Sequence, residues 1–330
     1  MRKATFAVVV FLAALCFATP SRAIVVAGPD PNGSMYSASG GGAFDGVAQL
    51  FLTFGSSTFG CSGGLLSTGR HVVTAGHCVA DSFGAALPGS SSVRFITESG
   101  TTNIAGASYI VNPAWDGDLF SGTDLAIITL AALAPADATR YDIYRNTDEV
   151  GQIGTLAGFG LGGTGATGPT AAYPFGTRRK GMNQFDALGS FFDVSGAILL
   201  FDFDNGLEAN DALRVAGLPD LGLGLSEVNI ASGDSGGPTF LDGKIAGVHS
   251  FGARLIVKDV ACPPDVETPA NLKGAAGCKL DFSFGELGGD MRVSSFQTFI
   301  DAALVPEPGS ILLMSSGLAG LLSFLRRSRK

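Results

Sequence analysis

The chain is divided into many short apolar runs by glycine, serine, asparagine and proline. Apolar runs of this length between turn-forming residues are typical of β-strands. No helical segments alternate with them, which favours paired β-barrels or a sandwich over an α/β fold. Glycine supplies 48 of the 330 residues, about twice its usual share of roughly 7%, so tight turns should be frequent. The expected strands lie within 47–54, 64–77, 92–98, 125–133, 153–160, 197–204, 236–241 and 244–251.

Two further segments have different patterns. Residues 291–304 place Val293, Phe296, Phe299 and Ile300 on one face at helical spacing, which predicts a closing helix. Residues 163–181 show no strand pattern and are expected to form a long mobile loop.

Residues 1–23 have the pattern of a secretory signal peptide. A basic start precedes an apolar stretch within 4–18, and Ser21 and Ala23 are the small residues before the cleavage point. The apolar stretch is short for a membrane anchor. We therefore expect signal peptidase to remove residues 1–23 and the protein to reach the periplasm, cell surface or exterior.

Residues 305–330 form a second targeting segment. Val305-Pro306-Glu307-Pro308 precedes an apolar run over 311–325 and a basic cluster at the last positions. The apolar run is shorter than the roughly 20 residues of a free-standing span. In this order the three parts resemble the PEP-CTERM sorting tail of Gram-negative bacteria. The resemblance implies transient anchoring in the inner membrane and cleavage by a sorting protease. A plain C-terminal anchor is the alternative.

Residues 24–304, which remain after both ends are removed, are strongly acidic. They carry 14 basic and 28 acidic side chains, a balance that disfavours binding to nucleic acid and to anionic membranes. They also contain four cysteines, Cys61, Cys78, Cys262 and Cys278. An even number in an exported chain predicts two disulfides, and three pairings are possible.

The strongest chemical motif is the segment 231–240, Ala-Ser-Gly-Asp-Ser-Gly-Gly-Pro-Thr-Phe. Its glycines leave the hydroxyl of Ser235 open to an approaching carbonyl group. The backbone N–H groups of Gly233 and Ser235 are expected to converge on an oxyanion. A plain glycine-rich turn is the alternative.

Two more segments complete a possible nucleophilic site. His77, within 74–78, would act as the general base for Ser235. Asp124 begins an apolar strand, where a carboxylate is costly unless it has a partner. The second ring nitrogen of His77 is the partner that fits. No histidine and cysteine grouping has the spacing of a zinc site, so no metal or cofactor is expected.

These motifs resemble those of trypsin-like, chymotrypsin-fold serine endopeptidases. The sequences at 60–78, 123–127, 158–160, 233–238 and 249–252 occur in the family's order within residues 24–304. The resemblance implies an all-β fold of two six-stranded antiparallel barrels, at about 24–145 and 146–304, with a C-terminal helix. It also implies a triad of His77, Asp124 and Ser235 that hydrolyses peptides through an acyl-Ser235 intermediate. A Cys61–Cys78 disulfide is implied too, which leaves Cys262 to pair with Cys278.

The resemblance also suggests a role for Ile24 and Val25, which follow the signal cleavage point directly. In this family a free N-terminal amine pairs with the aspartate that precedes the nucleophile, here Asp234, and opens the oxyanion hole. Signal peptidase would then be the activating enzyme. Val26-Ala27-Gly28 departs from the family's usual residues, and the alternative is that Ile24-Val25 is merely the first strand.

The residues expected to bind substrate depart from the trypsin pattern. Asn229 stands at the base of the primary pocket, where a neutral side chain offers no partner to Lys or Arg. Ser250, Phe251 and Gly252 match the strand that pairs with extended substrate. His249 matches a histidine that contacts acidic substrates in glutamate-specific relatives, and a packing role is the alternative.

Asp202 and Asp204, with Glu208 nearby, have a spacing that can hold calcium. No full calcium-loop pattern follows, so a solvated acidic turn is the favoured interpretation. Two other functions remain open for the chain as a whole: a catalytically silent binding or scaffold protein, and an esterase without peptidase activity.

Overall fold

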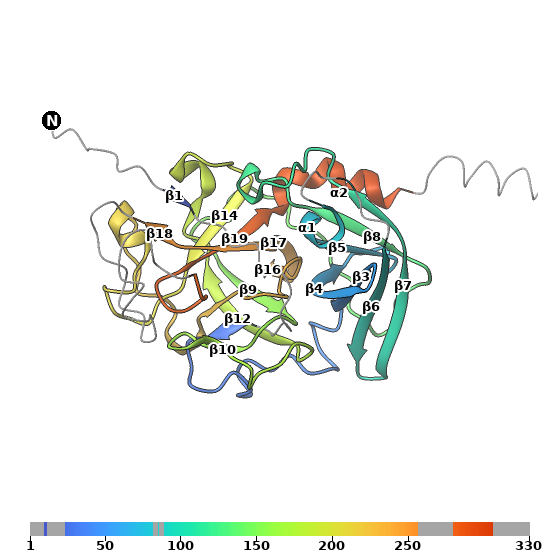
Figure 1. Ribbon diagram of the computed structural model, residues 1–330, viewed down its shortest axis with the longest axis horizontal. Coiled ribbons are helices and arrows are strands. Elements are labelled where there is room, and N and C mark those ends of the chain that lie inside the picture. Colours follow the sequence, from blue (N-terminus) through green and yellow to red (C-terminus); the bar gives the residue numbers. More distant parts are fainter. Residues whose placement is uncertain (1–9, 12–23, 82–84, 86–88, 257–279, 306–330) are drawn as a thin grey trace, which may run out of the picture.

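The computed structural model describes residues 10–11, 24–81, 85, 89–256 and 280–305. Two strand systems lie side by side, with the first barrel on the right of Figure 1 and the second sheet to its left. The cleavage point after Ala23, residues Cys262 and Cys278, and the tail beyond Val305 lie outside the described residues.

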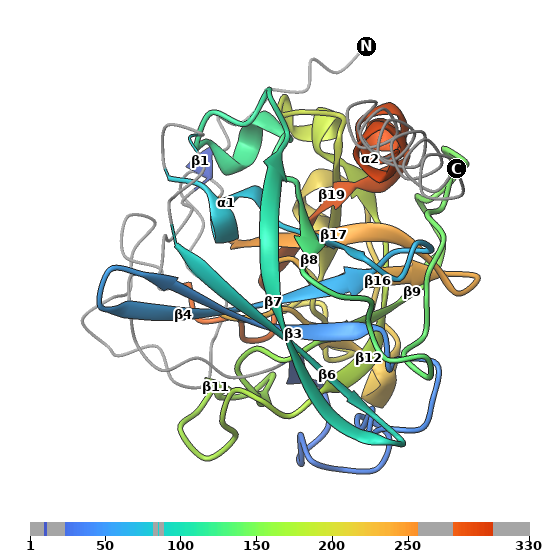
Figure 2. The ribbon, with the colours of Figure 1, turned by 90° about the vertical axis from the view of Figure 1, so that its right-hand side faces the viewer.

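The first strand system is a closed antiparallel barrel of six strands, seen with β7 in front in Figure 2. Alternate residues point inward along each strand, so that Val93 and Phe95 of β6 are buried between half-buried neighbours. The expected strands are confirmed at 47–54, 92–98 and 125–133. The strands are β3 (Val47–Phe54), β4 (Ser57–Leu65), β5 (His71–Thr74), β6 (Ser90–Thr97), β7 (Gly100–Val111) and β8 (Ala126–Leu130).

The second strand system is a seven-stranded antiparallel sheet that forms a half-barrel. The predicted fold class is confirmed, but this sheet has seven strands and ends at β12 and β13, whereas the prediction was a six-stranded barrel. In spatial order its strands are β12 (Arg179–Gln184), β9 (Ile153–Gly158), β16 (Pro238–Leu241), β17 (Lys244–Ala253), β19 (Leu287–Arg292), β14 (Ile198–Asp202) and β13 (Ala187–Leu188).

A small four-stranded sheet holds the start of the domain. Its strands run in the order β11 (Gly168–Pro169), β10 (Gly163–Thr164), β2 (Val25–Val26) and β15 (Val228–Asn229). The prediction of an unbroken loop over 163–181 is therefore wrong. β10 pairs in parallel with β2, and residues 179–181 belong to β12. Local composition hid these strands, because β10 and β11 are only two residues long and β10 depends on the distant β2 as its second partner.

The predicted closing helix is confirmed only in its second half. Residues 287–292 form β19, and Met291 pairs with Ile198 of β14 and Val248 of β17. A 3-10 turn at Val293–Phe296 then leads into α2 (Gln297–Leu304), at the top of Figure 1. The apolar spacing over 291–304 thus runs across the end of β19, the 3-10 turn and α2. Residues 291 and 292 are extended because β14 and β17 pair with β19 on both sides.

One hydrophobic core joins the two strand systems. It contains Val47 and Val73 of the first system together with Ile245 and Val248 of the second.

The remaining elements are short. They are β1 (Val10–Phe11), β18 (Leu255–Ile256), α1 (Gly76–Val79) and 3-10 turns at Leu119–Ser121, Gly189–Phe192, Leu213–Ala216 and Gly224–Ser226.

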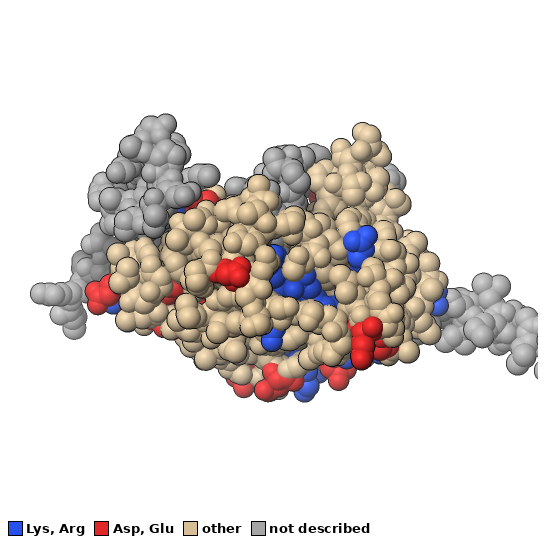
Figure 3. Space-filling view, turned by 90° about the horizontal axis from the view of Figure 1, so that it is seen from below, with Lys and Arg blue, Asp and Glu red and all other residues tan. Residues whose placement is uncertain are grey.

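The surface carries few charges for its size, as a chain with 15% charged residues requires. On the face drawn in Figure 3, acidic and basic side chains are scattered in small groups among uncharged residues. Within the described part of the chain, no helix has the length and apolar character needed to cross a bilayer.

Candidate active site

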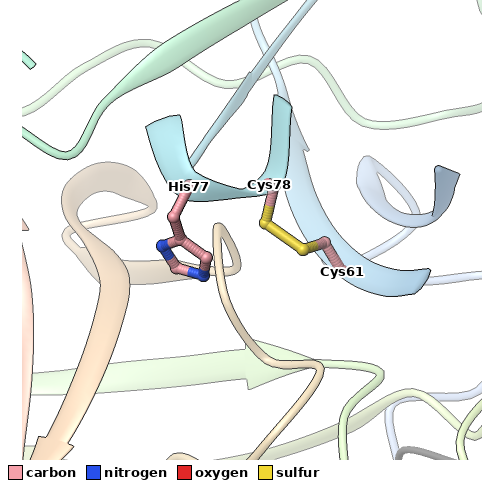
Figure 4. Close-up of side chains that lie close together, drawn as sticks. All are labelled: Cys61, His77 and Cys78. Atoms are coloured by element: carbon pink, nitrogen blue, oxygen red, sulfur yellow. A yellow bond between two sulfur atoms is a disulfide. The ribbon is translucent and has the colours of Figure 1, made fainter. Parts of the chain in front are cut away.

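His77 lies on α1, a single helical turn that follows β5. Ala75, the residue before α1, is extended, so the chain turns sharply from the barrel wall into the helix. The Cys61–Cys78 disulfide connects this turn to β4, as the resemblance implied. Figure 4 shows the ring of His77 and the disulfide on the same side of α1. Because both sulfurs are bonded to each other, the Cys61, His77 and Cys78 grouping is no metal site.

Asp124 holds His77 at two points. Its Oδ1 accepts the backbone N–H of His77 at 2.7 Å, and its Oδ2 lies 2.7 Å from Nδ1 of the ring. The Asp124 side chain has no exposed surface, whereas that of His77 is 23% exposed. The sequence therefore identified two side chains that the structure brings together, although 47 positions separate them.

Ser250 is a third partner of this carboxylate, which sequence reasoning missed. Its Oγ donates to Oδ2 of Asp124 at 2.5 Å. The sequence assigned Ser250 only to the substrate-pairing strand. No local signal could reveal the contact, since 126 positions separate the two residues.

The surroundings of His77 act on its pKa in opposite directions. Burial lowers the pKa, whereas the negative charge and the hydrogen bond of Asp124 raise it. The two effects of Asp124 together outweigh the effect of burial, so the pKa of His77 lies above its ordinary value. The Asp124 contact also leaves Nε2 as the ring nitrogen that can face a nucleophile.

Ser235 lies in the loop between β15 and β16, next to α1. Its carbonyl oxygen accepts the backbone N–H of Ser62 at 2.8 Å and lies 3.7 Å from Sγ of Cys78. The following residue, Gly236, has φ = 81°, and a Cβ there would lie 2.0 Å from Oγ1 of Thr74. Only glycine allows the loop to approach the barrel this closely.

Two backbone donors of this loop are unoccupied. Within the described part of the chain, the N–H groups of Gly233 and Ser235 have no hydrogen-bond acceptor. Gly233 has φ = 92°, and its carbonyl oxygen points instead to the hydroxyl of Ser62 at 2.9 Å. The hydroxyl of Ser235 forms no hydrogen bond with a ring nitrogen of His77. In ligand-free sites such catalytic bonds are often long.

Asp234 anchors the start of the domain. Oδ2 accepts the backbone nitrogen of Ile24 at 2.8 Å and that of Ala231 at 3.0 Å, and Oδ1 accepts that of Gly160 at 2.8 Å. Asp234 has no exposed surface. Burial raises its pKa to about 7, while the hydrogen bonds from Gly160, Ile24 and Ala231 act in the opposite direction.

Asn229 belongs to β15 of the small sheet, whereas Ser250, Phe251 and Gly252 lie on β17, next to β19. Asn229 has no exposed surface, its Oδ1 accepts the N–H of Ile230, and its Nδ2 has no partner among the described residues. Phe251 packs edge-on against Phe120 at 5.0 Å between ring centroids. A Cβ on Gly252 would lie 2.4 Å from the ring of Phe282, so this backbone is tightly packed on one face.

His249 is enclosed in the second sheet. It has no exposed surface, and its Nε2 lies 3.1 Å from Oγ1 of Thr239, which in turn donates to Asp290. Burial lowers the pKa of His249 to about 3, so the ring is neutral at ordinary pH. This burial supports a packing role for His249 over direct contact with an acidic substrate.

The acidic turn after β14 also differs from its favoured interpretation. Asp202 and Asp204 are 3% and 1% exposed, so the turn is not solvated. Glu208 lies apart from them and pairs at the surface with Arg214 at 2.9 Å. Asp211, which sequence reasoning left out, takes its place beside the two aspartates.

Comparisons with known proteins agree with this geometry. Residues 40–182 match the trypsin family model, and residues 304–330 match the PEP-CTERM protein-sorting motif. None of the curated proteins matches the chain. Among solved structures, mouse neuropsin, a serine protease expressed in the limbic system of the brain, superposes with a TM-score of 0.52 at 18% identity, over 78% of this chain and 94% of neuropsin.

The likeness to neuropsin is one of fold, and the sorting motif indicates export and membrane-associated sorting. Together with the closed barrel, the half-barrel and the short C-terminal helix, these matches show a chymotrypsin-like fold in which residues 40–182 match the trypsin family model, followed by a PEP-CTERM sorting motif.

Proposed function

We propose that the protein is an exported serine endopeptidase with His77, Asp124 and Ser235 as its catalytic triad. The observation that carries the proposal is that Asp124 contacts His77 twice: one carboxylate oxygen accepts the backbone N–H at 2.7 Å, and the other lies 2.7 Å from Nδ1. A buried carboxylate with that geometry fixes the tautomer in which Nε2 can accept a proton.

The proposed reaction is that of a serine nucleophile activated by a general base. Oγ of Ser235 attacks the carbonyl carbon of the peptide as its proton passes to Nε2 of His77. The N–H groups of Gly233 and Ser235 receive the oxyanion, a contribution of about 3–4 kcal/mol to the barrier in such sites. His77 then protonates the departing amine, and water releases the acyl group from Ser235 by the reverse sequence.

Extended substrate would bind along β17. β16 pairs with β17 only as far as Val248, and the backbone N–H of His249 bonds to Gly237. Beyond this point, at Ser250–Gly252, only the edge next to β19 is paired among the described residues. The opposite edge can add a peptide strand. Because Asn229 is neutral, we expect the residue before the cleaved bond to be neither Lys nor Arg.

The ends of the chain define the compartment and the active form. Signal peptidase would release Ile24 as the new N-terminus, beside Asp234, and leave residues 24–304 as the peptidase domain. The PEP-CTERM tail would hold the protein at the inner membrane until a sorting protease removes it. The enzyme would then act on peptides in the periplasm or at the cell surface.

The test is cleavage of a mixed peptide library by the exported protein, with Ser235→Ala as the control. We expect cleavage to fall at least 10³-fold in the control, and the residues before the cuts to define the preference. Equal cleavage by both proteins would exclude Ser235 as the nucleophile. Hydrolysis of activated esters without peptide cleavage would restrict the activity to an esterase. No turnover by protein that starts at Ile24 would favour the scaffold alternative.

A further inference from the structure

Three aspartates that the proposed mechanism does not use converge behind the second sheet. Asp202 is the last residue of β14, and Asp204 follows it two positions later. Asp211 reaches them from the next loop. One carboxylate oxygen of each lies within 4.8 Å of those of the other two. All three residues are at most 4% exposed.

Asp204 lacks any partner for its charge among the described residues. Both of its carboxylate oxygens are buried without a hydrogen bond. Oδ2 of Asp211 has no hydrogen bond either, and the nearest cation, Nη1 of Arg214, is 3.8 Å away. The adjacent Asn210 is 8% exposed, and its amide oxygen is also unpaired. Buried polar atoms without partners are rare and costly in folded proteins.

The neighbouring carboxylates accept hydrogen bonds from backbone N–H groups, and as acids they cannot neutralise the charge of Asp204. Oδ2 of Asp186 accepts the N–H of Asp202, and Glu227 accepts the N–H groups of Asp204 and Leu223. Asp220 accepts two N–H groups of its own turn. Within the group of three, Oδ2 of Asp202 accepts the N–H of Leu213 at 3.0 Å and Asp211 has Arg214 at 3.8 Å, so Asp204 is the member that lacks both a donor and a counter-charge among the described residues.

The local electrostatics agree with this geometry. Burial raises the pKa of Asp204 to about 9, and the charges of Asp202, Glu227 and Asp211 act in the same direction. Burial likewise raises the pKa of Asp202 to about 8, with Asp186 as the next cause. A bound cation would favour the charged form of both carboxylates and so oppose both shifts.

We propose that Asp202, Asp204 and Asp211 bind a calcium ion. All the available ligands are oxygens, which selects a hard cation over zinc or copper. Calcium bonds carboxylate oxygens at about 2.3–2.6 Å, so one ion can reach all three. Magnesium retains several waters and a strict octahedral geometry, which a buried set of three carboxylates suits poorly. The unpaired oxygen of Asn210 is the next candidate ligand.

Such an ion would brace the second half of the domain. It would connect the end of β14 to the loop that carries Asp211. Through the contact of Asp204 with Glu227, it would also support the segment before β15, whose Val228 pairs with Val26 of β2. The proposal does not depend on peptidase activity, because it concerns binding and stability alone.

The experiment is a calcium titration of the purified full chain after treatment with a chelator. Ser235→Ala is present throughout to prevent self-digestion. We expect one Ca²⁺ per chain by calorimetry, with a dissociation constant no weaker than the roughly 10⁻³ M of extracellular calcium sites. Calcium at 100 times that constant should raise the thermal midpoint by about 5–10 °C. Magnesium at the same concentration should raise it much less.

A substitution separates a cation site from a merely structural cluster. Asp204→Asn removes a buried carboxyl group whose two oxygens have no partner among the described residues, so it should raise the thermal midpoint in chelator yet abolish the further rise with calcium. Glu208→Gln, in the same loop but paired at the surface with Arg214, should retain the full calcium response. Absence of calcium binding by the wild type, or an unchanged response in Asp204→Asn, would overturn the proposal.

Discussion

The backbone nitrogen of Ile24 lies 2.8 Å from Oδ2 of Asp234, although 210 positions separate them. The same carboxylate accepts the N–H groups of Gly160 and Ala231, the second of which precedes Gly233 by two positions. Asp234 therefore connects the start of the domain to the loop that carries the two unoccupied N–H groups.

The first prediction concerns the charge on that nitrogen. Protein that begins at Ile24 should be fully active, whereas protein that retains Ala23 should have a kcat/KM lower by about 10²–10³-fold. A neutral amide cannot form the ion pair with Asp234, and the size matches the loss of an oxyanion donor. Peptide cleavage assays on both forms, with N-termini confirmed by mass spectrometry, provide the measurement. Equal activity of the two forms would show that signal cleavage is not the activating step.

The second prediction concerns Asp124. Asp124→Asn should lower kcat about 10³–10⁴-fold, because the tautomer of His77 is no longer held. In the wild type, protonated His77 cannot accept the Ser235 proton, so kcat/KM should rise as pH increases through a midpoint above 6.5. The midpoint should move to lower pH in Asp124→Asn, since the charge that raises the pKa is gone.

A matched control for Asp124→Asn is available in Asp242→Asn. Asp242 is exposed in the turn between β16 and β17, at φ = 50°, a conformation that asparagine also tolerates. Its pH–rate profile should coincide with that of the wild type. A profile of Asp124→Asn that kept the wild-type midpoint would argue against the proposed pairing.

The third prediction concerns acid stability and His249. In the folded protein the pKa of His249 is lowered to about 3, whereas in the unfolded chain it is about 6.5. Below pH 6.5 the unfolded chain therefore binds a proton at this residue that the folded one cannot, so the contribution of His249 to stability is lost as pH falls toward 3. His249→Gln should reduce this loss. Urea unfolding at pH 7 and pH 4, in the Ser235→Ala background, measures it. An equal loss in both proteins would contradict the assignment.

The fourth prediction concerns the disulfide between β4 and α1. Its cysteines are 17 positions apart, and closure of a loop of about that length is worth ~3 kcal/mol in the chain-entropy model. Replacing Cys61 and Cys78 together by Ala should lower the thermal midpoint by roughly 5–10 °C. Calorimetry of the Ser235→Ala protein with and without the pair tests this. An unchanged midpoint would mean that the link adds nothing to stability.

Local pattern was sufficient for several parts of this protein. The alternation and turn residues around 47–54 and 153–160 predicted strands that the structure contains. The glycines around Ser235 predicted a backbone free of bulk, and a Cβ on Gly236 would indeed meet Oγ1 of Thr74. Such features depend on neighbours within a few positions, so the sequence by itself determined them, as it did the C-terminal sorting motif.

Tertiary structure decided the rest, because the deciding contacts join distant residues. Residues 291 and 292 belong to a strand rather than to the predicted helix, since β14 and β17 pair with β19 on both sides. The burial of His249, the contact of Ser250 with Asp124 and the convergence of Asp211 on Asp204 depend on how the sheets pack. A periodic pattern predicts which face of an element is apolar. Which polar and charged side chains become buried together depends on how distant elements pack in the folded protein.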